Sequence, residues 1–147
     1  MEFVLAKEKD VDEIFTLYQT KEQSFKDRGI KQWANYTSDS RFPKKYFLEM
    51  IQNKKLYVLK QENIITSACV LLGEEIKNFV NGRSGSGTLL LHQLSKMCTS
   101  QGLKSIKLEC RDDNAKLRNY YENQGFEKTG EYDDQGDIMA NMYKHLN

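Results

Sequence analysis

The chain has 147 residues, 22 basic and 21 acidic side chains and a formal net charge of +1. That length predicts one domain with its own core, over residues 1–147, and the balanced charge without a basic stripe argues against nucleic-acid binding. Three widely spaced cysteines and two histidines predict neither a disulfide framework nor a metal site. The polar start and the lack of a long apolar run predict a cytoplasmic protein without a membrane partner.

Apolar residues recur with the periods of helices and strands along the whole chain. In order, the pattern predicts a strand at Phe3–Leu5, helices at 10–28 and 44–53, strands at Leu56–Lys60, Ile64–Leu72 and Ile76–Val80, a helix ending at Gly102, a strand at Lys104–Cys110, a helix ending at Gly125, and strands at Phe126–Tyr132 and Ile138–Tyr143. The order β-α-α-β-β-β-α-β-α-β-β predicts one mixed α+β domain.

Residues with special backbone preferences mark the ends of these elements. Asp10 and Glu13 have the spacing of a capping box at the start of the first helix, and Gly29 is expected to end that helix. Pro43 suits the start of the second helix. Turns are expected at residues 61–63, 73–75 and 133–136.

The segment between the first two helices, Ile30–Pro43, is polar but carries Trp33, Tyr36 and Phe42. Aromatic side chains in an irregular segment either plug the edge of the core or line a pocket. Trp33 and Tyr36 are therefore the candidate substrate-binding residues.

Three glycines, Gly82, Gly85 and Gly87, precede the central helix. A glycine-rich loop that leads into a helix presents backbone N–H groups and the positive end of the helix dipole to an anion. Gly85 and Gly87 lack a Cβ atom that would keep a phosphate from the backbone. The alternative is a plain flexible turn, which is the usual role of an isolated pair of glycines.

Two stretches resemble the GNAT superfamily of acetyl-CoA-dependent N-acetyltransferases: GSGTLLL at residues 85–91 and NAKLRNYYENQGF at 114–126. The family has a glycine loop that binds the cofactor pyrophosphate, followed by a Thr and a pair of apolar residues. It then has an Asn, a Tyr seven residues later and a Gly-Phe pair, and this chain has Asn114, Tyr121, Gly125 and Phe126 at that spacing. Two motifs in the right order indicate far more than either alone.

The resemblance implies a mostly antiparallel central sheet flanked by about four helices, with acetyl-CoA as cofactor. It implies cofactor contacts from Val80, Arg83, Ser84, Gly85, Ser86, Gly87, Thr88, Asn114 and Tyr121. The chain departs from the family pattern at three points. Gly82 stands at the Gln/Arg position of the loop, with Arg83 one place late, and Ser86 stands at a usually apolar position. The strand before the loop, which in the family pairs with the pantetheine arm and often supplies a carboxylate, looks short.

Acetyl transfer to an amine requires a bound thioester, a neutral amine and a proton for the departing thiolate. Tyr121 is the candidate acid, because a phenol with a pKa near 10 is protonated at neutral pH; the alternative is a ring in the core. Glu75, with Glu74 beside it, is the candidate base, although carboxylates in turns are usually only solvated. Cys110 is an alternative, covalent nucleophile, but a buried strand cysteine is the more ordinary interpretation.

For three other residues, a structural role and a functional one stay open. Arg83 either binds phosphate or is a solvated surface side chain. Asn114 either caps its helix or contacts the pantetheine arm, and the two roles are compatible. The cysteines, Cys69 and Cys98 included, are expected to be buried and reduced.

The sequence thus predicts an N-acetyltransferase that works by direct attack in a ternary complex. The alternative is a GNAT-like module that binds CoA or a regulatory ligand without turnover. A nucleotide-hydrolysing P-loop is excluded, because the loop lacks the Gly-Lys-Ser/Thr ending. The acceptor, a small-molecule amine or a protein amine, stays open, as does a homodimer.

Overall fold

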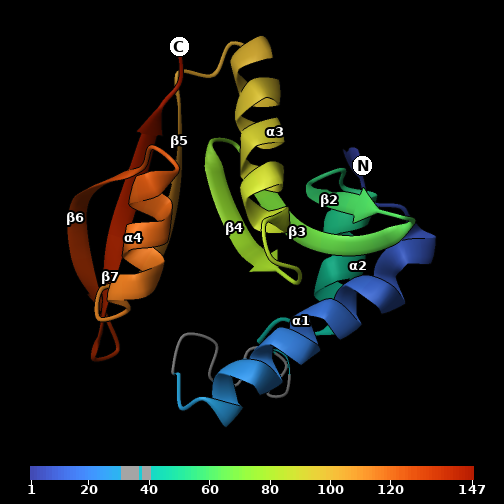
Figure 1. Cartoon of the computed structure of the whole chain (residues 1–147), viewed down its shortest axis with the longest axis horizontal. Helices are drawn as coiled ribbons and strands as arrows, with labels where there is room; N and C mark the ends of the chain where they lie inside the picture. The colour runs from blue at the N-terminus through green and yellow to red at the C-terminus, as the bar shows by residue number, and fades with distance from the viewer. Residues whose placement is uncertain (31–36, 38–40) are drawn as a thin grey trace. The chain divides into compact units, whose positions relative to one another are not determined.

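The computed structural model describes residues 1–30, 37 and 41–147. In that part of the chain lie the strands and helices β1 (Glu2–Leu5), α1 (Val11–Asp27), α2 (Lys44–Gln52), β2 (Leu56–Gln61), β3 (Ile64–Leu72), β4 (Glu75–Asn81), α3 (Ser86–Ser100), β5 (Ser105–Arg111), α4 (Ala115–Asn123), β6 (Glu127–Asp134) and β7 (Asp137–His145), with a short 3₁₀ helix at Glu8–Asp10 (Figure 1). The predicted order of elements is confirmed.

Seven strands pair in the order β1-β2-β3-β4-β5-β7-β6. The pairing of β4 with β5 is parallel, through Glu75 and Lys107, whereas β1 with β2, β2 with β3, β5 with β7 and β6 with β7 are antiparallel. The expected mixed, mostly antiparallel sheet is confirmed. The chain forms two compact units, Met1–Leu71 with Asn78–Leu90, and Leu72–Lys77 with Leu91–Asn147, and β4 passes from one to the other between Lys77 and Asn78.

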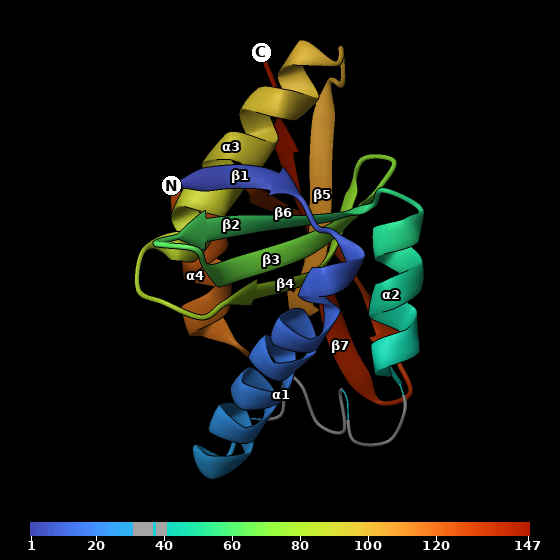
Figure 2. The same cartoon turned by 90° about the vertical axis from the view of Figure 1, so that its right-hand side faces the viewer.

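In the first unit, β1, β2 and β3 lie side by side (Figure 2) and contribute to a core that α1 and α2 complete. Residues 65–71 of β3 are all buried, so both faces of that strand are covered, and its sequence does not alternate between apolar and polar residues. Tyr18 of α1 and Phe47 of α2 stack with ring centroids 4.5 Å apart. Both are fully buried, so this aromatic pair fixes the two helices over the strands.

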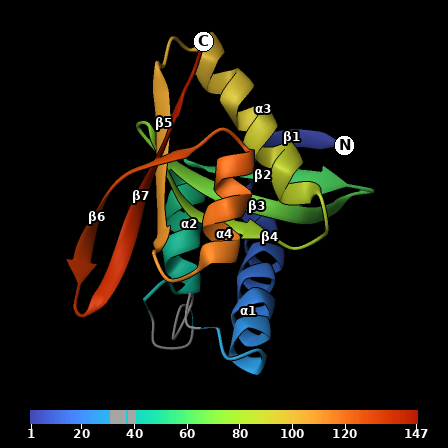
Figure 3. The same ribbon diagram turned by 60° about the vertical axis from the view of Figure 1, so that its left-hand side comes forward.

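In the second unit, β5 alternates as predicted: Ile106, Leu108 and Cys110 are buried and the residues between them are not. The strands β6 and β7 form a long hairpin whose β7 strand pairs with β5, and α4 lies beside the β5–β7 pair (Figure 3). The rings of Tyr121 in α4 and Phe126 meet edge-on with centroids 5.9 Å apart, which anchors the end of α4.

The capping box predicted from Asp10 and Glu13 is wrong. The Asp10 carboxylate instead accepts a hydrogen bond of 2.9 Å from the backbone N–H of Lys7, one turn earlier, because the chain enters α1 through the 3₁₀ helix. Glu13 turns toward β3, where its carboxylate accepts from the N–H of Ile65 at 2.8 Å. Gly29, with φ of +69°, follows the end of α1 as expected.

Two of the predicted turns are tighter than expected, and β4 is longer. Glu62 and Asn63 alone join β2 to β3, and Gln135 and Gly136 alone join β6 to β7; all four have positive φ, as the twist of a two-residue hairpin requires. Glu75, expected in a turn, is the first residue of β4, so the strand before the loop is not abbreviated.

A cluster of buried hydroxyl groups fixes the start of α3 against β3. The Ser86 hydroxyl lies 2.6 Å from that of Thr66 and donates to that of Ser67 at 2.8 Å. The Ser67 hydroxyl in turn donates to the Ser86 carbonyl at 3.2 Å. Ser86 is only 1% exposed, so the polar residue at a position expected to be apolar is explained by its partners in β3.

We therefore predict that Ser86→Ala destabilises the fold by roughly 1–2 kcal/mol, because it removes the two buried hydrogen bonds that the Ser86 hydroxyl forms with Thr66 and Ser67. Urea denaturation measures the change in the free energy of unfolding. Ser100→Ala, at the exposed end of the same helix, is the matched control and should change it by less than about 0.5 kcal/mol. Equal losses for the two variants would contradict a special role for the cluster.

Candidate functional site

The loop between β4 and α3 is shorter than the sequence predicted (Figure 1). Since α3 begins at Ser86, only residues 82–85 form the loop, and Gly87 and Thr88 belong to the first helical turn. Gly85 has φ of +83°, a conformation that other L-residues rarely adopt. A glycine at this position is therefore required by the backbone itself.

Gly82 and Gly87 are required for a different reason, close packing. A Cβ atom on Gly82 would lie 2.4 Å from Cδ1 of Leu17, and one on Gly87 would lie 2.7 Å from Cζ of Phe79. Both neighbours are the packed side chains of the first unit. A Cβ atom at position 82 would also lie 3.1 Å from the backbone oxygen of Thr66, so a longer side chain there requires the Leu17 side chain of α1 to move.

The backbone amides of this loop divide into two groups. The N–H of Ser86 donates to the carbonyl of Arg83 at 2.9 Å, and that of Gly87 donates to Oδ1 of Asn81 at 3.0 Å. In the described part of the chain, no group accepts from the N–H of Arg83, Ser84 or Gly85. These three amides precede the first turn of a 15-residue helix, where an anion is favoured by the helix dipole.

The side chains of the loop are arranged as an anion site would require. Arg83 and Ser84 are exposed, and Arg83 forms no ion pair with any described residue. Ser86 and Val80 are buried, at 1% each, with Val80 in the core of the first unit. Of these four residues, only Arg83 and Ser84 therefore offer a side chain to a ligand in solution.

Asn114 and Tyr121 lie on α4, in the second unit, whereas the loop lies in the first. Asn114 is the N-cap of α4, since its Oδ1 accepts from the N–H of Leu117 at 3.1 Å. Tyr121 is 5% exposed and packs against Tyr120 and Phe126, with Tyr120 half-buried. The structural role expected for Asn114 is confirmed.

The two candidate carboxylates differ in their surroundings. Glu74 lies in the turn before β4, and its carboxylate accepts from the Ser105 hydroxyl at 3.1 Å. The Glu75 side chain is 28% exposed, and its carboxylate lies 3.9 Å from the Lys77 ammonium. Glu75 also lines a cavity of about 400 Å³ in the second unit, which the sequence did not predict. The substrate candidates Trp33 and Tyr36 lie outside the described residues.

The three cysteines are buried and form no disulfide, as predicted. Burial raises the pKa of the Cys98 thiol, and it raises the pKa of the Cys110 thiol to about 11. Since the thiolate is the nucleophile, Cys110 is poorly suited to covalent catalysis. No cluster of three potential metal-binding side chains lies among the described residues, and no helix of that part of the chain could cross a membrane.

The model of the acetyltransferase (GNAT) family matches residues 82–126. No curated protein sequence matches the chain. The fold is similar to those of a GNAT-family acetyltransferase from Listeria monocytogenes (TM-score 0.80, 17% identity, 99% of this chain and 94% of that chain) and a ribosomal-protein-alanine N-acetyltransferase from Brucella melitensis (0.75, 16%, 99% and 100%). It is also similar to that of PaiA N-acetyltransferase from Thermoplasma acidophilum in complex with coenzyme A (0.76, 15%, 99% and 98%). The matched segment runs from the glycine loop to the end of the Asn114–Phe126 motif.

The raised pKa values of Cys98 and Cys110 predict that both thiols resist alkylation in the folded protein. At a pH of about 8.5, a free cysteine is half ionised and reacts with iodoacetamide, whereas a buried thiol stays protonated. Mass spectrometry should show modification only after denaturation. Rapid native labelling of Cys110 would contradict its burial and restore the covalent alternative.

Proposed function

We propose that this chain, which has the fold of the GNAT acetyltransferases and matches their family model at residues 82–126, is an acetyl-CoA-dependent N-acetyltransferase. The observation that carries the proposal is the set of three adjacent amides, Arg83, Ser84 and Gly85, that have no acceptor in the described part of the chain. They lie within the segment that the family model matches. Residues 1–147 would then work as one acetyltransferase domain.

The donors of the loop fit a pyrophosphate. Three N–H groups at a helix N-terminus, with the Arg83 guanidinium beside them, supply hydrogen bonds and positive charge to phosphate oxygens. The N–H of Gly87 would bind the pyrophosphate only if its hydrogen bond to Oδ1 of Asn81 were broken. The proposed role of Ser86 and Thr88 is to keep the start of α3 in place. The backbone of Val80 in β4 and the cap residue Asn114 are the proposed contacts of the pantetheine arm. The similar structure with bound coenzyme A supports this cofactor.

Two residues are proposed for the proton transfers. When bound, acetyl-CoA supplies an acetyl group activated as a thioester. The acceptor amine must lose a proton to become a nucleophile, and Glu75 is the proposed base for that proton. The Tyr121 hydroxyl is the proposed donor to the sulfur as the thiolate leaves. Attack by the amine is direct, since the buried thiol of Cys110 is protonated at neutral pH.

The acceptor is proposed to be a primary amine, on a small molecule or on a protein, bound with the help of Trp33 and Tyr36. The similarity to a ribosomal-protein-alanine N-acetyltransferase, at 16% identity, is one of fold. It does not distinguish a small-molecule acceptor from a protein acceptor. A screen of amines with a thiol assay for released CoA identifies the acceptor class.

The first test concerns the cofactor loop. Arg83→Glu should weaken acetyl-CoA binding about tenfold or more, because it removes a charge-assisted contact and adds a repelling charge. Acetyl-CoA should raise the melting temperature of the wild type, since a ligand that binds only the native state stabilises it. Calorimetric titration then measures the dissociation constant of each variant.

Lys45→Glu is the matched control, because Lys45 is an exposed residue of the same unit that forms no ion pair with the described residues. It makes the same change in net charge and should leave acetyl-CoA affinity within about twofold. If Arg83→Glu and Lys45→Glu weaken binding equally, the effect is one of overall charge and the loop assignment is wrong.

The second test isolates the hydroxyl of Tyr121. Tyr121→Phe keeps the ring that packs against Phe126, so stability and acetyl-CoA affinity should change little. The acetyl-transfer step should slow about 100-fold, the lower end of the range for general acid catalysis, because a thiolate is a tolerable leaving group. Single-turnover rates with a responsive amine measure the step without interference from product release.

Tyr120→Phe, at the neighbouring position of α4, is the control and should keep the wild-type rate. The assignment of Tyr121 fails if its variant reacts at the wild-type rate, or if Tyr120→Phe is the slower of the two.

A further inference from the structure

The second unit contains a cavity of about 400 Å³ at the strands β4 to β7. Its lining residues are Glu75, Lys107, Leu108, Glu109, Thr129, Gly130, Asn141 and Tyr143. Apart from Glu75, none of them belongs to the machinery proposed above. This volume falls in the range of small-molecule sites and is too small to hold part of a folded protein.

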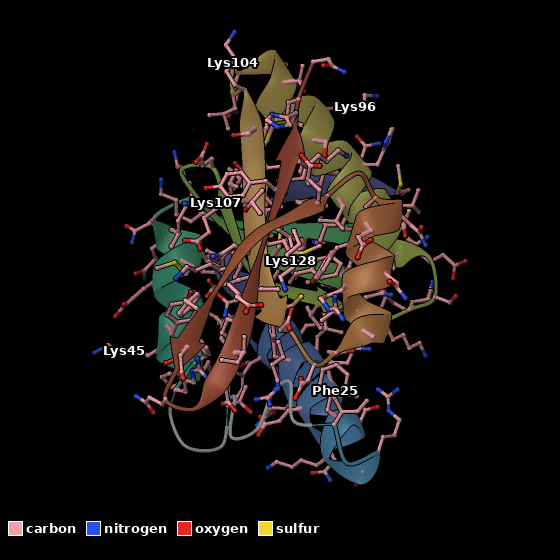
Figure 4. The ribbon with its side chains drawn as sticks, turned by 90° about the vertical axis from the view of Figure 1, so that its left-hand side faces the viewer. Phe25, Lys45, Lys96, Lys104, Lys107 and Lys128 are labelled. Atoms are coloured by element: carbon pink, nitrogen blue, oxygen red, sulfur yellow. The ribbon has the colours of Figure 1, made fainter. Side chains whose placement is uncertain are left out.

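Strand pairing explains why polar side chains gather there. In β5, Lys107 and Glu109 point away from the buried residues Ile106, Leu108 and Cys110. Register then places Tyr143 opposite Lys107 and Asn141 opposite Glu109 (Figure 4 labels Lys107 on β5). Glu75 of β4 pairs with Lys107 from the other side. The polar lining residues of β4, β5 and β7 thus share one face of the sheet, whereas Leu108 faces the core.

A glycine opposite Asn141 keeps this face hollow. The register of β6 with β7 shifts between Lys128 and Gly130, and Gly130 pairs with Asn141. The nearest heavy atom to a Cβ built on Gly130 is Nδ2 of Asn141, at 4.0 Å, and φ of Gly130 is not positive. A side chain would therefore fit at this position, and its absence leaves room for a ligand.

The charges of the cavity favour a cation. Two carboxylates, Glu75 and Glu109, and one ammonium, Lys107, line the cavity, which leaves a net charge of −1 among the lining residues. The Glu75 carboxylate also lies 3.9 Å from the Lys77 ammonium, so Glu109 is the lining carboxylate that has no ion pair with a described residue. The Lys107 ammonium lies 5.9 Å from the centre of the Tyr143 ring, a cation–π contact within its own strand pair.

A tyrosine of β6 that is not itself a lining residue holds one of these carboxylates in place. The Tyr132 hydroxyl donates to Oε1 of Glu109 at 2.8 Å. Burial, and then the hydrogen bond to Glu109, raises the pKa of Tyr132 to about 12, and the charges of Glu109, Asp134 and Glu75 act in the same direction. The phenol therefore stays a donor at neutral pH and orients Glu109, whose other oxygen accepts no hydrogen bond within the described part of the chain.

We propose that this cavity binds a protonated amino group of an acceptor that carries at least two amines, a short aliphatic diamine or polyamine. The proposal rests on the proposed function, since the acetylated amine must be neutral and a carboxylate-lined cavity suits the amine that keeps its charge. Glu109 accepts the ammonium hydrogen bonds together with the Asn141 carboxamide, and Gly130 supplies the space. An alkyl chain with one ammonium can occupy the cavity as well, but only a second amine remains to be acetylated, so turnover requires the diamine.

Calorimetric titration of the full chain with 1,4-diaminobutane and with 1,4-butanediol, an uncharged molecule of equal length, tests the proposal directly, without need for turnover. The wild type should bind the diamine at least about tenfold more tightly, the value of one hydrogen bond to a charged group. Glu109→Gln should abolish this preference, because the amide keeps the bond from Tyr132 but carries no charge. Gly130→Val should weaken diamine binding by filling the cavity, and Glu122→Gln, exposed on α4, should change nothing.

Urea denaturation verifies that each variant keeps its fold, and an acetyl-CoA titration runs in parallel. No preference for the diamine in the wild type, or full diamine affinity in both cavity variants, overturns the cavity proposal while intact acetyl-CoA binding leaves the proposed function standing. If the wild type does not bind acetyl-CoA, the proposed function is overturned, whether or not the diamine binds.

Discussion

The close contact between the start of α3 and strand β3 is the constraint on which the proposed cofactor loop depends. Ser86 is bound through its hydroxyl to Thr66 and Ser67, and Gly87 approaches Phe79 too closely for any side chain. These contacts place the helix before any ligand arrives, so the amides of residues 83–85 are presented by a fixed scaffold. A binding site that is already ordered loses less entropy when the ligand binds, which favours affinity.

Tyrosine hydroxyl groups hold several polar residues of the strands in place. Asn78 has φ of +54° inside β4, a strained conformation for any residue other than glycine. Its carbonyl accepts from the Tyr18 hydroxyl, and its Oδ1 accepts from the Tyr46 hydroxyl at 2.6 Å. The two tyrosines come from α1 and α2, so both helices support the point where β4 passes between the units. In the second unit, the Tyr132 hydroxyl likewise donates to Glu109, although both of these residues are exposed.

The order of elements could be predicted from the sequence, because apolar periodicity and glycines at helix ends are local signals. The motif from Asn114 to Phe126 was equally local, and the cap role of Asn114 is confirmed. The roles of the three glycines could not be told apart from the sequence. Gly85 is favoured by its own positive φ angle, whereas Gly82 and Gly87 are favoured by the side chains that pack against them. Nor could the cavity be predicted. Although β5 alternates clearly, its partners in β7 and β6 follow from strand register, which no local pattern contains.

Acetyl transfer itself tests the central claim most directly. The protein is incubated with acetyl-CoA and a panel of primary amines, and mass spectrometry follows each amine while a thiol assay follows released CoA. The account predicts that at least one amine gains a single acetyl group in step with CoA release, and that the reaction requires the protein. Tight acetyl-CoA binding without acetylation of any amine, small or peptidic, would contradict it and would identify the chain as a cofactor-binding module instead.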